Sequence, residues 1–230
     1  MSETPPIDPA AIRPPVAAEG LPWEEPNAGL GTIVPTAARF LGNPSRAFRA
    51  MSLTVDLVRP IAYFVAFGLV GAIVSQLWSV LLWDSMMGAI RNLVPPQFQS
   101  MLQRPSALQI ALGLVISPLV SMIVLFVWSG VVHLILALLG GASAGFSATL
   151  RTVCYARTAD VATVVPILGG LVGFVWRRVL EIIGLSEAHR TDGWKAALAV
   201  FVPMLLCCLC VVGGALAFGA AISQALQQMK

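Results

Sequence analysis

Four stretches of this chain carry almost no charge and are predicted to lie in a membrane. They are residues 60–83, 118–139, 161–176 and 196–221. The first and the last contain 24 and 26 residues without a single Asp, Glu, Lys or Arg. Because about 20 apolar residues in a helix cross a hydrocarbon core of about 30 Å, both are long enough to span it. The sequence therefore predicts an integral membrane protein, an all-α, polytopic transmembrane helical bundle.

The composition agrees with a membrane protein. Hydrophobic residues make up 57% of the 230 residues. Charged residues make up only 11%, less than half of the roughly 25% that is usual in soluble domains. The mean hydropathy is +0.84. A chain of this length and composition suits one helical bundle with a short tail.

Residues 1–30 differ from the rest of the chain. They hold one Arg, five acids and seven prolines, with no apolar core of the kind that a cleavable signal peptide needs. Such a segment buries too little apolar surface to fold alone, which predicts a disordered, acidic, Pro-rich cytoplasmic tail. Within it, Pro22-Trp23-Glu24 stands out. Either Trp23 rests at the membrane interface, or the motif docks a cytoplasmic protein partner.

Three further regions follow this tail. Residues 31–59 combine apolar and basic side chains, which predicts an amphipathic segment on the membrane interface. Residues 60–222 form the expected transmembrane domain, and residues 223–230 a C-terminal tail. Residues 31–230 carry 13 bases and six acids, so we expect contact with anionic membrane lipids. Nothing in this pattern indicates a nucleic-acid partner.

Prolines mark two expected interruptions. Residues 85–104 place apolar side chains around Pro95-Pro96, which predicts a second interfacial element rather than a span. Residues 107–139 are an apolar run of 33 residues, about 50 Å as one straight helix. This length exceeds the hydrocarbon core, so we expect a break at Pro118.

The number of spans depends on the region between the second and the last apolar stretch. One arrangement places residues 146–160 on the membrane surface and gives four spans. The other forms a helical hairpin of residues 146–164 and 167–184 that turns at Pro166, and gives five. Arginines before the first span place the N-terminus in the cytoplasm, and five spans keep the basic loop after the hairpin there too. We therefore favour about five spans, with the N-terminus in the cytoplasm.

The five-span arrangement places two charged residues and a histidine inside the membrane. Arg157 and Asp160 are three residues apart, so they can pair on one helix. His133 lies in the second span. Charges at this depth are costly and often mark a polar site for ions or protons. The alternative is structural: an ion pair that fixes helix rotation, and a neutral histidine bonded to a neighbouring helix.

No enzyme signature is present. The chain lacks a phosphate-binding loop, a His-Glu-x-x-His motif and a nucleophile elbow. Cys207 and Cys210 have zinc-like spacing, but no His or acid lies in the same apolar helix to complete a metal site. We expect no catalytic residues, no cofactor and no metal.

An ordered set of segments resembles bacterial members of the Yip family, the Ypt/Rab-interacting-protein-like membrane proteins. The resemblance covers about residues 20–215. The segments that carry it are Gly20-Leu21-Pro22-Trp23-Glu24, Thr36, Pro44-Ser45-Arg46-Ala47-Phe48, Met51, residues 146–155 ending at Tyr155, Val165-Pro166-Ile167, Gly169, Trp176, Ile183-Gly184-Leu185 and His189.

The resemblance implies an all-helical domain of about five spans with a cytoplasmic N-terminal tail. Eukaryotic relatives are associated with Rab-type GTPases and vesicle traffic. The resemblance to bacterial members implies a bacterial inner membrane, where no such traffic exists, so the fold transfers to this chain better than the function. The family pattern supplies no catalytic residue.

Two functions follow as expectations. The first is a non-enzymatic membrane scaffold or adaptor that engages cytoplasmic partners and lipid. The alternative is a small transporter or channel that uses Arg157, Asp160 and His133. Small residues on several helices are also compatible with a homo-oligomer.

Overall fold

The computed structural model describes residues 20–53, 56–91, 94 and 103–228. Within these residues the chain is helical and contains no strand. The elements, with η for 3₁₀ helices, are η2 (Pro22–Glu24), η3 (Leu30–Thr32), α1 (Ile33–Gly42), α2 (Pro44–Ala50), α3 (Val58–Arg91), α4 (Ala107–Leu138), α5 (Gly145–Ala156), η5 (Arg157–Val164), α6 (Leu168–His189) and α7 (Gly193–Gln228).

Three helices are long and apolar enough to cross a membrane. They contribute the segments Val58–Gly88, Ala107–Leu138 and Gly193–Gly219, of 31, 32 and 27 residues. Many apolar side chains on these helices are exposed. Soluble monomers do not expose apolar patches of this extent to water, so lipid or protein covers them. The prediction of an all-helical integral membrane protein is confirmed. The count of five spans stays a prediction, because η5 and α6 are not among these three helices.

The expected break at Pro118 is wrong. Helix α4 runs without interruption from Ala107 to Leu138, with the proline inside it. A proline lacks the N–H that would bond the carbonyl of Leu114, four residues earlier. Ser117 supplies the substitute, because its hydroxyl donates to that carbonyl at 3.2 Å. The helix therefore keeps its carbonyl satisfied and passes through the proline.

Helix α3 also extends beyond its expected end. It continues to Arg91, so residues 85–91 belong to the first long helix rather than to a separate interfacial element. No proline lies between Pro60 and Pro95, and the Met and Ala residues in 85–91 favour helix. Residues 92–93 and 95–102 of the predicted interfacial element, including Pro95-Pro96, lie outside the described residues.

The predicted hairpin is present. Helices α5 and η5 run down one arm, the chain turns at Val165-Pro166-Ile167, and α6 returns beside them. The arms approach closely at Gly169, where a Cβ atom would overlap the carbonyl oxygen of Ala162. At Gly173 a Cβ would lie 3.0 Å from the Ala159 carbonyl oxygen. Glycine at these positions lets the backbones meet.

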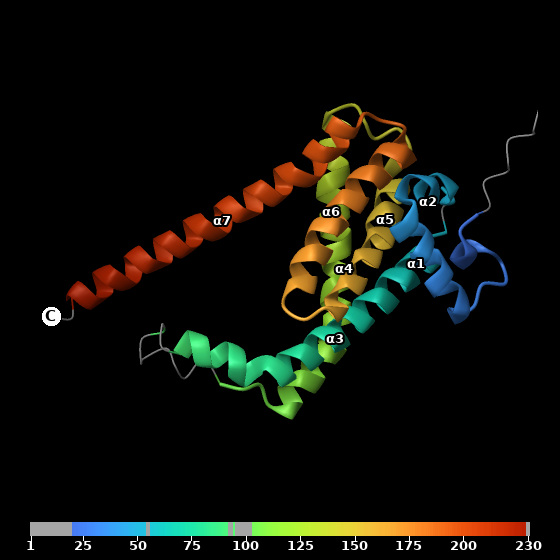
Figure 1. Cartoon of the computed structure of the whole chain (residues 1–230). Helices are drawn as coiled ribbons and strands as arrows, with labels where there is room; N and C mark the ends of the chain where they lie inside the picture. The colour runs from blue at the N-terminus through green and yellow to red at the C-terminus, as the bar shows by residue number, and fades with distance from the viewer. Residues whose placement is uncertain (1–19, 54–55, 92–93, 95–102, 229–230) are drawn as a thin grey trace, which may run out of the picture.

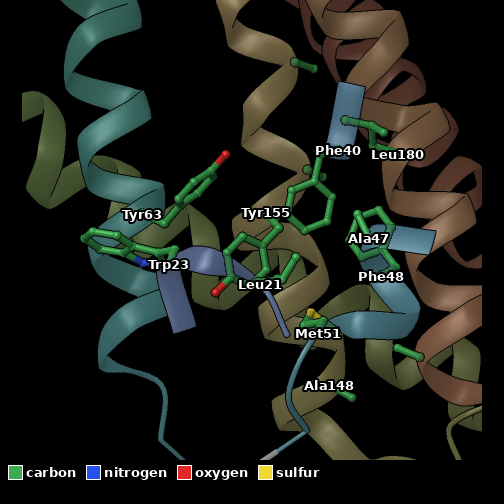
Figure 2. Packing of buried hydrophobic residues seen from close by; sticks show 13 residues of the cluster. Leu21, Trp23, Phe40, Ala47, Phe48, Met51, Tyr63, Ala148, Tyr155 and Leu180 are labelled. Atoms are coloured by element: carbon green, nitrogen blue, oxygen red, sulfur yellow. The ribbon is translucent and has the colours of Figure 1, made fainter. Parts of the chain in front are cut away.

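Residues 20–52 form a head that packs against the hairpin and the start of α3 (Figure 1). This differs from the expected tail over residues 20–30, because Leu21 and Trp23 are buried there. Residues 1–19 of that predicted tail lie outside the described residues. Figure 2 shows the aromatic rings that converge beneath the head, Trp23, Phe40, Phe48, Tyr63 and Tyr155. Burial of these large side chains is the main force that holds the head in place.

Helix α7 is attached to the bundle only by its first turns. Ala196, Ala199 and Val200 are buried against α4 and α6. Beyond them the helix diverges from the bundle (Figure 1), and Leu205 and Leu209 are exposed. A long apolar helix with this much exposure has lipid or a second protein surface along it.

Candidate functional site

The carboxylate of Glu24 is clamped by three groups from two segments, helix α5 and the residues that follow α2. Its Oε1 accepts hydrogen bonds from Arg151 at 2.7 Å and from the Tyr155 hydroxyl at 2.8 Å. Its Oε2 accepts the backbone N–H of Ser52 at 2.7 Å. The Arg151 side chain is 2% exposed and that of Glu24 is 9% exposed, so this is a buried ion pair. Arg151 also donates to the carbonyl of Asp56, which ties the linker before α3 to the same point.

Trp23 is held by a reciprocal pair of bonds with Arg59. Its indole Nε1 donates to the Arg59 carbonyl at 2.7 Å, and the Arg59 guanidinium donates to the Trp23 carbonyl at 2.8 Å. The Trp23 backbone N–H donates to the Thr36 hydroxyl at 3.0 Å. The motif Pro22-Trp23-Glu24 therefore contacts this chain's own helices. Its use by a partner stays a prediction.

A second charged group lies where η5 meets α6. We call Arg157, Asp160, Arg177, Arg178 and Glu181 the arginine cluster. Arg157 pairs with Asp160 at 2.9 Å, as their spacing allows, and Arg178 pairs with the fully buried Glu181 at 2.6 Å. Arg177 lies between the two carboxylates, 3.9 Å from Asp160 and 3.5 Å from Glu181.

Aromatic rings on the long helices contact this cluster. The guanidinium carbon of Arg157 lies 4.2 Å from the centroid of the Phe64 ring on α3. That of Arg178 lies 4.7 Å from the Trp128 ring on α4, and the Trp128 indole donates to Glu181 at 3.2 Å. Such cation–π contacts stabilise guanidinium groups that have lost water. The cluster is thereby fixed between the hairpin and the long helices.

Two cavities adjoin the cluster and share Arg157, Phe64 and Ser121. The first, about 280 Å³, lies between α3, α4 and η5. Its polar lining consists of Ser75, Ser117, Ser121, Arg157, Asp160 and Thr163. The second, about 380 Å³, is bounded by α4, α6 and the part of α7 that leaves the bundle.

His133 belongs to a different group from Arg157 and Asp160. Its Nδ1 lies 2.8 Å from the Thr149 hydroxyl, which in turn lies 2.9 Å from His189 Nε2. The backbone N–H of Ala144 donates to His189 Nδ1 at 3.0 Å, so that nitrogen carries no proton. Burial, together with the nearby His133, lowers the pKa of His189 to about 4. The structure thus unites two of the three predicted polar residues and separates the third.

The family-like residues Tyr155, Pro166 and Gly169 have structural positions. Tyr155 bonds Glu24, Pro166 lies in the hairpin turn, and Gly169 lets the two arms meet. Sequence reasoning missed Arg151 and Glu181 as site residues. The spacing of Glu181 from Arg177 and Arg178 is a local signal that could have indicated an ion-pair network. No local signal could connect Arg151 with Glu24, because 127 residues separate them.

The cysteines offer no metal site. Cys207, Cys208 and Cys210 are free and exposed on α7, whereas Cys154 is buried. Among the residues that the structure describes, no three His, Cys, Asp or Glu side chains gather in a way that could hold a metal ion.

Comparison with known proteins gives the family. No curated protein and no solved structure matches this chain. The family model of the Yip1 domain matches residues 38–215, most of the chain, from the head to the exposed part of α7. This match does not bear on the expected bacterial type. The long apolar helices and this match agree, and the chain belongs to the Yip1 domain family.

Proposed function

We propose that the protein is a non-enzymatic membrane scaffold or adaptor whose head presents a binding surface to cytoplasmic partners and to lipid. The observation that carries the proposal is the clamp on Glu24. It fixes a segment outside the long helices to the membrane domain through a buried ion pair. Clamped in this way, the head offers a partner a fixed surface rather than a loose tail.

The outer face of the head supplies that surface. Leu30 is 80% exposed and Val34 is 73% exposed, whereas Phe40, on the same helix as Val34, is buried. A cavity of about 370 Å³ along α1 and α2 is lined in part by Arg39, Asn43 and Arg46. Exposed apolar side chains and basic groups in one head suit an acidic, amphipathic segment of a partner protein.

A crosslinked membrane pull-down tests this role. The variant carries Leu30→Ser and Val34→Ser, which remove exposed apolar groups without touching the core. The matched control is Asp192→Ser, at an exposed residue in the turn before α7. Soluble partners recovered with wild type and control but lost with the double variant support the adaptor role. The same partners from all three proteins would count against it.

The alternative, a small transporter or channel, is favoured by the polar cavity beside Arg157 and Asp160. Hydroxyl groups and an ion pair line a space of about 280 Å³ next to apolar helices. If the cavity conducts, Asp160→Asn abolishes flux into proteoliposomes while the protein stays folded. Wild-type flux in this variant, or no flux in wild type across common ions, excludes that role for Asp160.

A further inference from the structure

We propose that the arginine cluster binds the phosphate of an anionic phospholipid that enters sideways between α4, α6 and α7. Three guanidinium groups face two carboxylates there, which leaves one positive charge for an anion. The inference deepens the lipid contact of the proposed function but uses residues remote from the outer face of the head. The two can therefore fail independently.

Arg177 is the residue most available to a ligand. Its contacts with Asp160 and Glu181, at 3.9 and 3.5 Å, are both longer than an N–H···O hydrogen bond. Arg157 and Arg178, in contrast, are engaged at 2.9 and 2.6 Å. Arg177 is 19% exposed and is one of the residues that line the larger cavity. Guanidinium groups bind phosphate oxygens in bidentate fashion.

The larger cavity has the chemistry of a lipid site. Arg157, Arg177 and Arg178 supply one side of its lining. The remaining walls are mostly apolar, including Val120, Val124, Phe174, Met204 and Cys207. A free phosphate ion would use the arginines only, whereas a phospholipid would also cover the apolar walls. The mixed lining therefore favours the lipid.

The cluster lies at the depth of a headgroup. Along α3, the distance from Phe64 to Gly88 is about 36 Å at 1.5 Å per residue. Along α4, Trp128 lies about 32 Å from Ala107, and along α7 Cys207 lies about 32 Å from Gln228. Measured along its own axis, each long helix thus has enough residues beyond the cluster to cross about one hydrocarbon thickness. The cluster itself is then at the boundary between headgroups and acyl chains.

The hairpin agrees with this depth. From Arg177 to Leu168 the arm of α6 extends about 14 Å, less than half of the core. Its tip is apolar and exposed at Leu168, Leu171 and Val172. The hairpin therefore enters one leaflet and returns. Its two ends lie on the same side of the membrane, as they would in the five-span arrangement.

The divergence of α7 leaves the lateral path open. The C-terminal part of α7 separates from α4 and α6 (Figure 1), and Met204 and Cys207 of α7 line the larger cavity. Leu205 and Leu206 on α7 are 58% and 56% exposed, and Leu171 on α6 is 64% exposed. Acyl chains can fill the space between these faces while the phosphate reaches the arginines.

Native mass spectrometry of the full-length, delipidated protein tests the site. The protein is titrated with phosphatidylglycerol, with phosphatidylcholine of the same acyl chains, and with glycerol phosphate. We expect one phosphatidylglycerol to bind preferentially. Arg177→Gln should weaken it about tenfold, because hydrogen bonds to a charged group are among the strongest in proteins. This variant leaves the two short ion pairs intact.

Three further variants serve as controls and as a second test of the site. Arg190→Gln removes the same charge at an exposed residue outside the cluster, and should leave binding unchanged. Cys207→Phe fills the cavity without changing charge, and should weaken phosphatidylglycerol while Leu209→Phe, beside it on α7, does not. Equal losses in Arg177→Gln and Arg190→Gln, or equal binding of both lipids by wild type, would overturn the proposal. If glycerol phosphate binds as tightly as phosphatidylglycerol, the site binds a free phosphate anion and the proposal of a lipid ligand is wrong.

Discussion

The buried ion pair between Glu24 and Arg151 adds a polar attachment to the aromatic packing that holds the head. Removing one partner of a buried pair leaves the other charge without compensation. Arg151 is 2% exposed, so it cannot regain its hydration while the head stays in place. Loss of the Glu24 carboxylate should therefore weaken the contact between the head and the bundle.

Glu24→Gln should destabilise the protein by about 3 kcal/mol, because the amide cannot neutralise Arg151. The effect is measured by thermal unfolding in detergent and by tryptic cleavage within residues 20–52. Glu25→Gln, at the exposed neighbouring residue, should change stability by less than about 0.5 kcal/mol. If both variants unfold alike, the clamp does not hold the head.

Because the pKa of His189 is lowered in the folded protein, we expect the protein to lose stability in mild acid. Its pKa is about 4 in the folded protein and close to 6.5 when unfolded, so the unfolded chain binds more protons between these values. The contribution of neutral His189 to the free energy of unfolding is fully present above about pH 6.5 and is lost as the pH falls toward 4. We expect a loss of about 1–2 kcal/mol by pH 5.

Protonation also turns the His189 Nδ1 acceptor into a donor that faces the Ala144 N–H. The check is the melting temperature of wild type and His189→Asn between pH 7.5 and 5. The variant should be less stable at pH 7.5 and should show a shallower pH dependence. Parallel curves would assign the acid sensitivity to other groups.

At the scale of elements, the hairpin depends on glycine where its arms touch. Gly169→Ala should cost about 1–3 kcal/mol, because its Cβ would overlap the Ala162 carbonyl oxygen and force the arms apart. Gly170→Ala is the matched control, since a Cβ there meets nothing within 4 Å. Thermal unfolding should rank Gly169→Ala well below wild type and Gly170→Ala at or above it. The reverse order would contradict the packing of the hairpin.

At the scale of the whole molecule, the head and the hairpin are joined at Gly184. A Cβ there would lie 2.5 Å from Thr152 Cγ2 and 2.7 Å from Phe48 Cε1. Gly184→Ala should therefore loosen the head as well as destabilise the protein, by about 1–3 kcal/mol. Tryptic cleavage in the head and thermal unfolding measure the two effects. Gly193→Ala, with open space around its Cβ, should change neither.

A double-mutant cycle separates this coupling from a local effect. Phe48→Leu removes the ring that the new methyl group would meet, so the combined variant should be more stable than the sum of the two single changes predicts. Strict additivity would mean that the methyl group acts through Thr152 alone.

The sequence alone determined the properties that depend on short stretches of chain. Apolar length predicted a membrane protein, proline and glycine predicted the hairpin turn at Pro166, and three-residue spacing allowed Arg157 to pair with Asp160. These are local because hydropathy, backbone preference and helical spacing act over a few residues. The same local reasoning failed at Pro118, where the adjacent Ser117 hydroxyl satisfies the freed carbonyl.

Only the tertiary structure decided which distant groups meet. It joined Glu24 to Arg151, placed His133 beside His189 rather than beside Asp160, and brought Arg177 between two carboxylates. Each of these pairings depends on the path of the chain through the bundle and on close approaches at Gly169 and Gly184. A buried charge needs a partner, but its own neighbours in sequence do not specify which distant group supplies it.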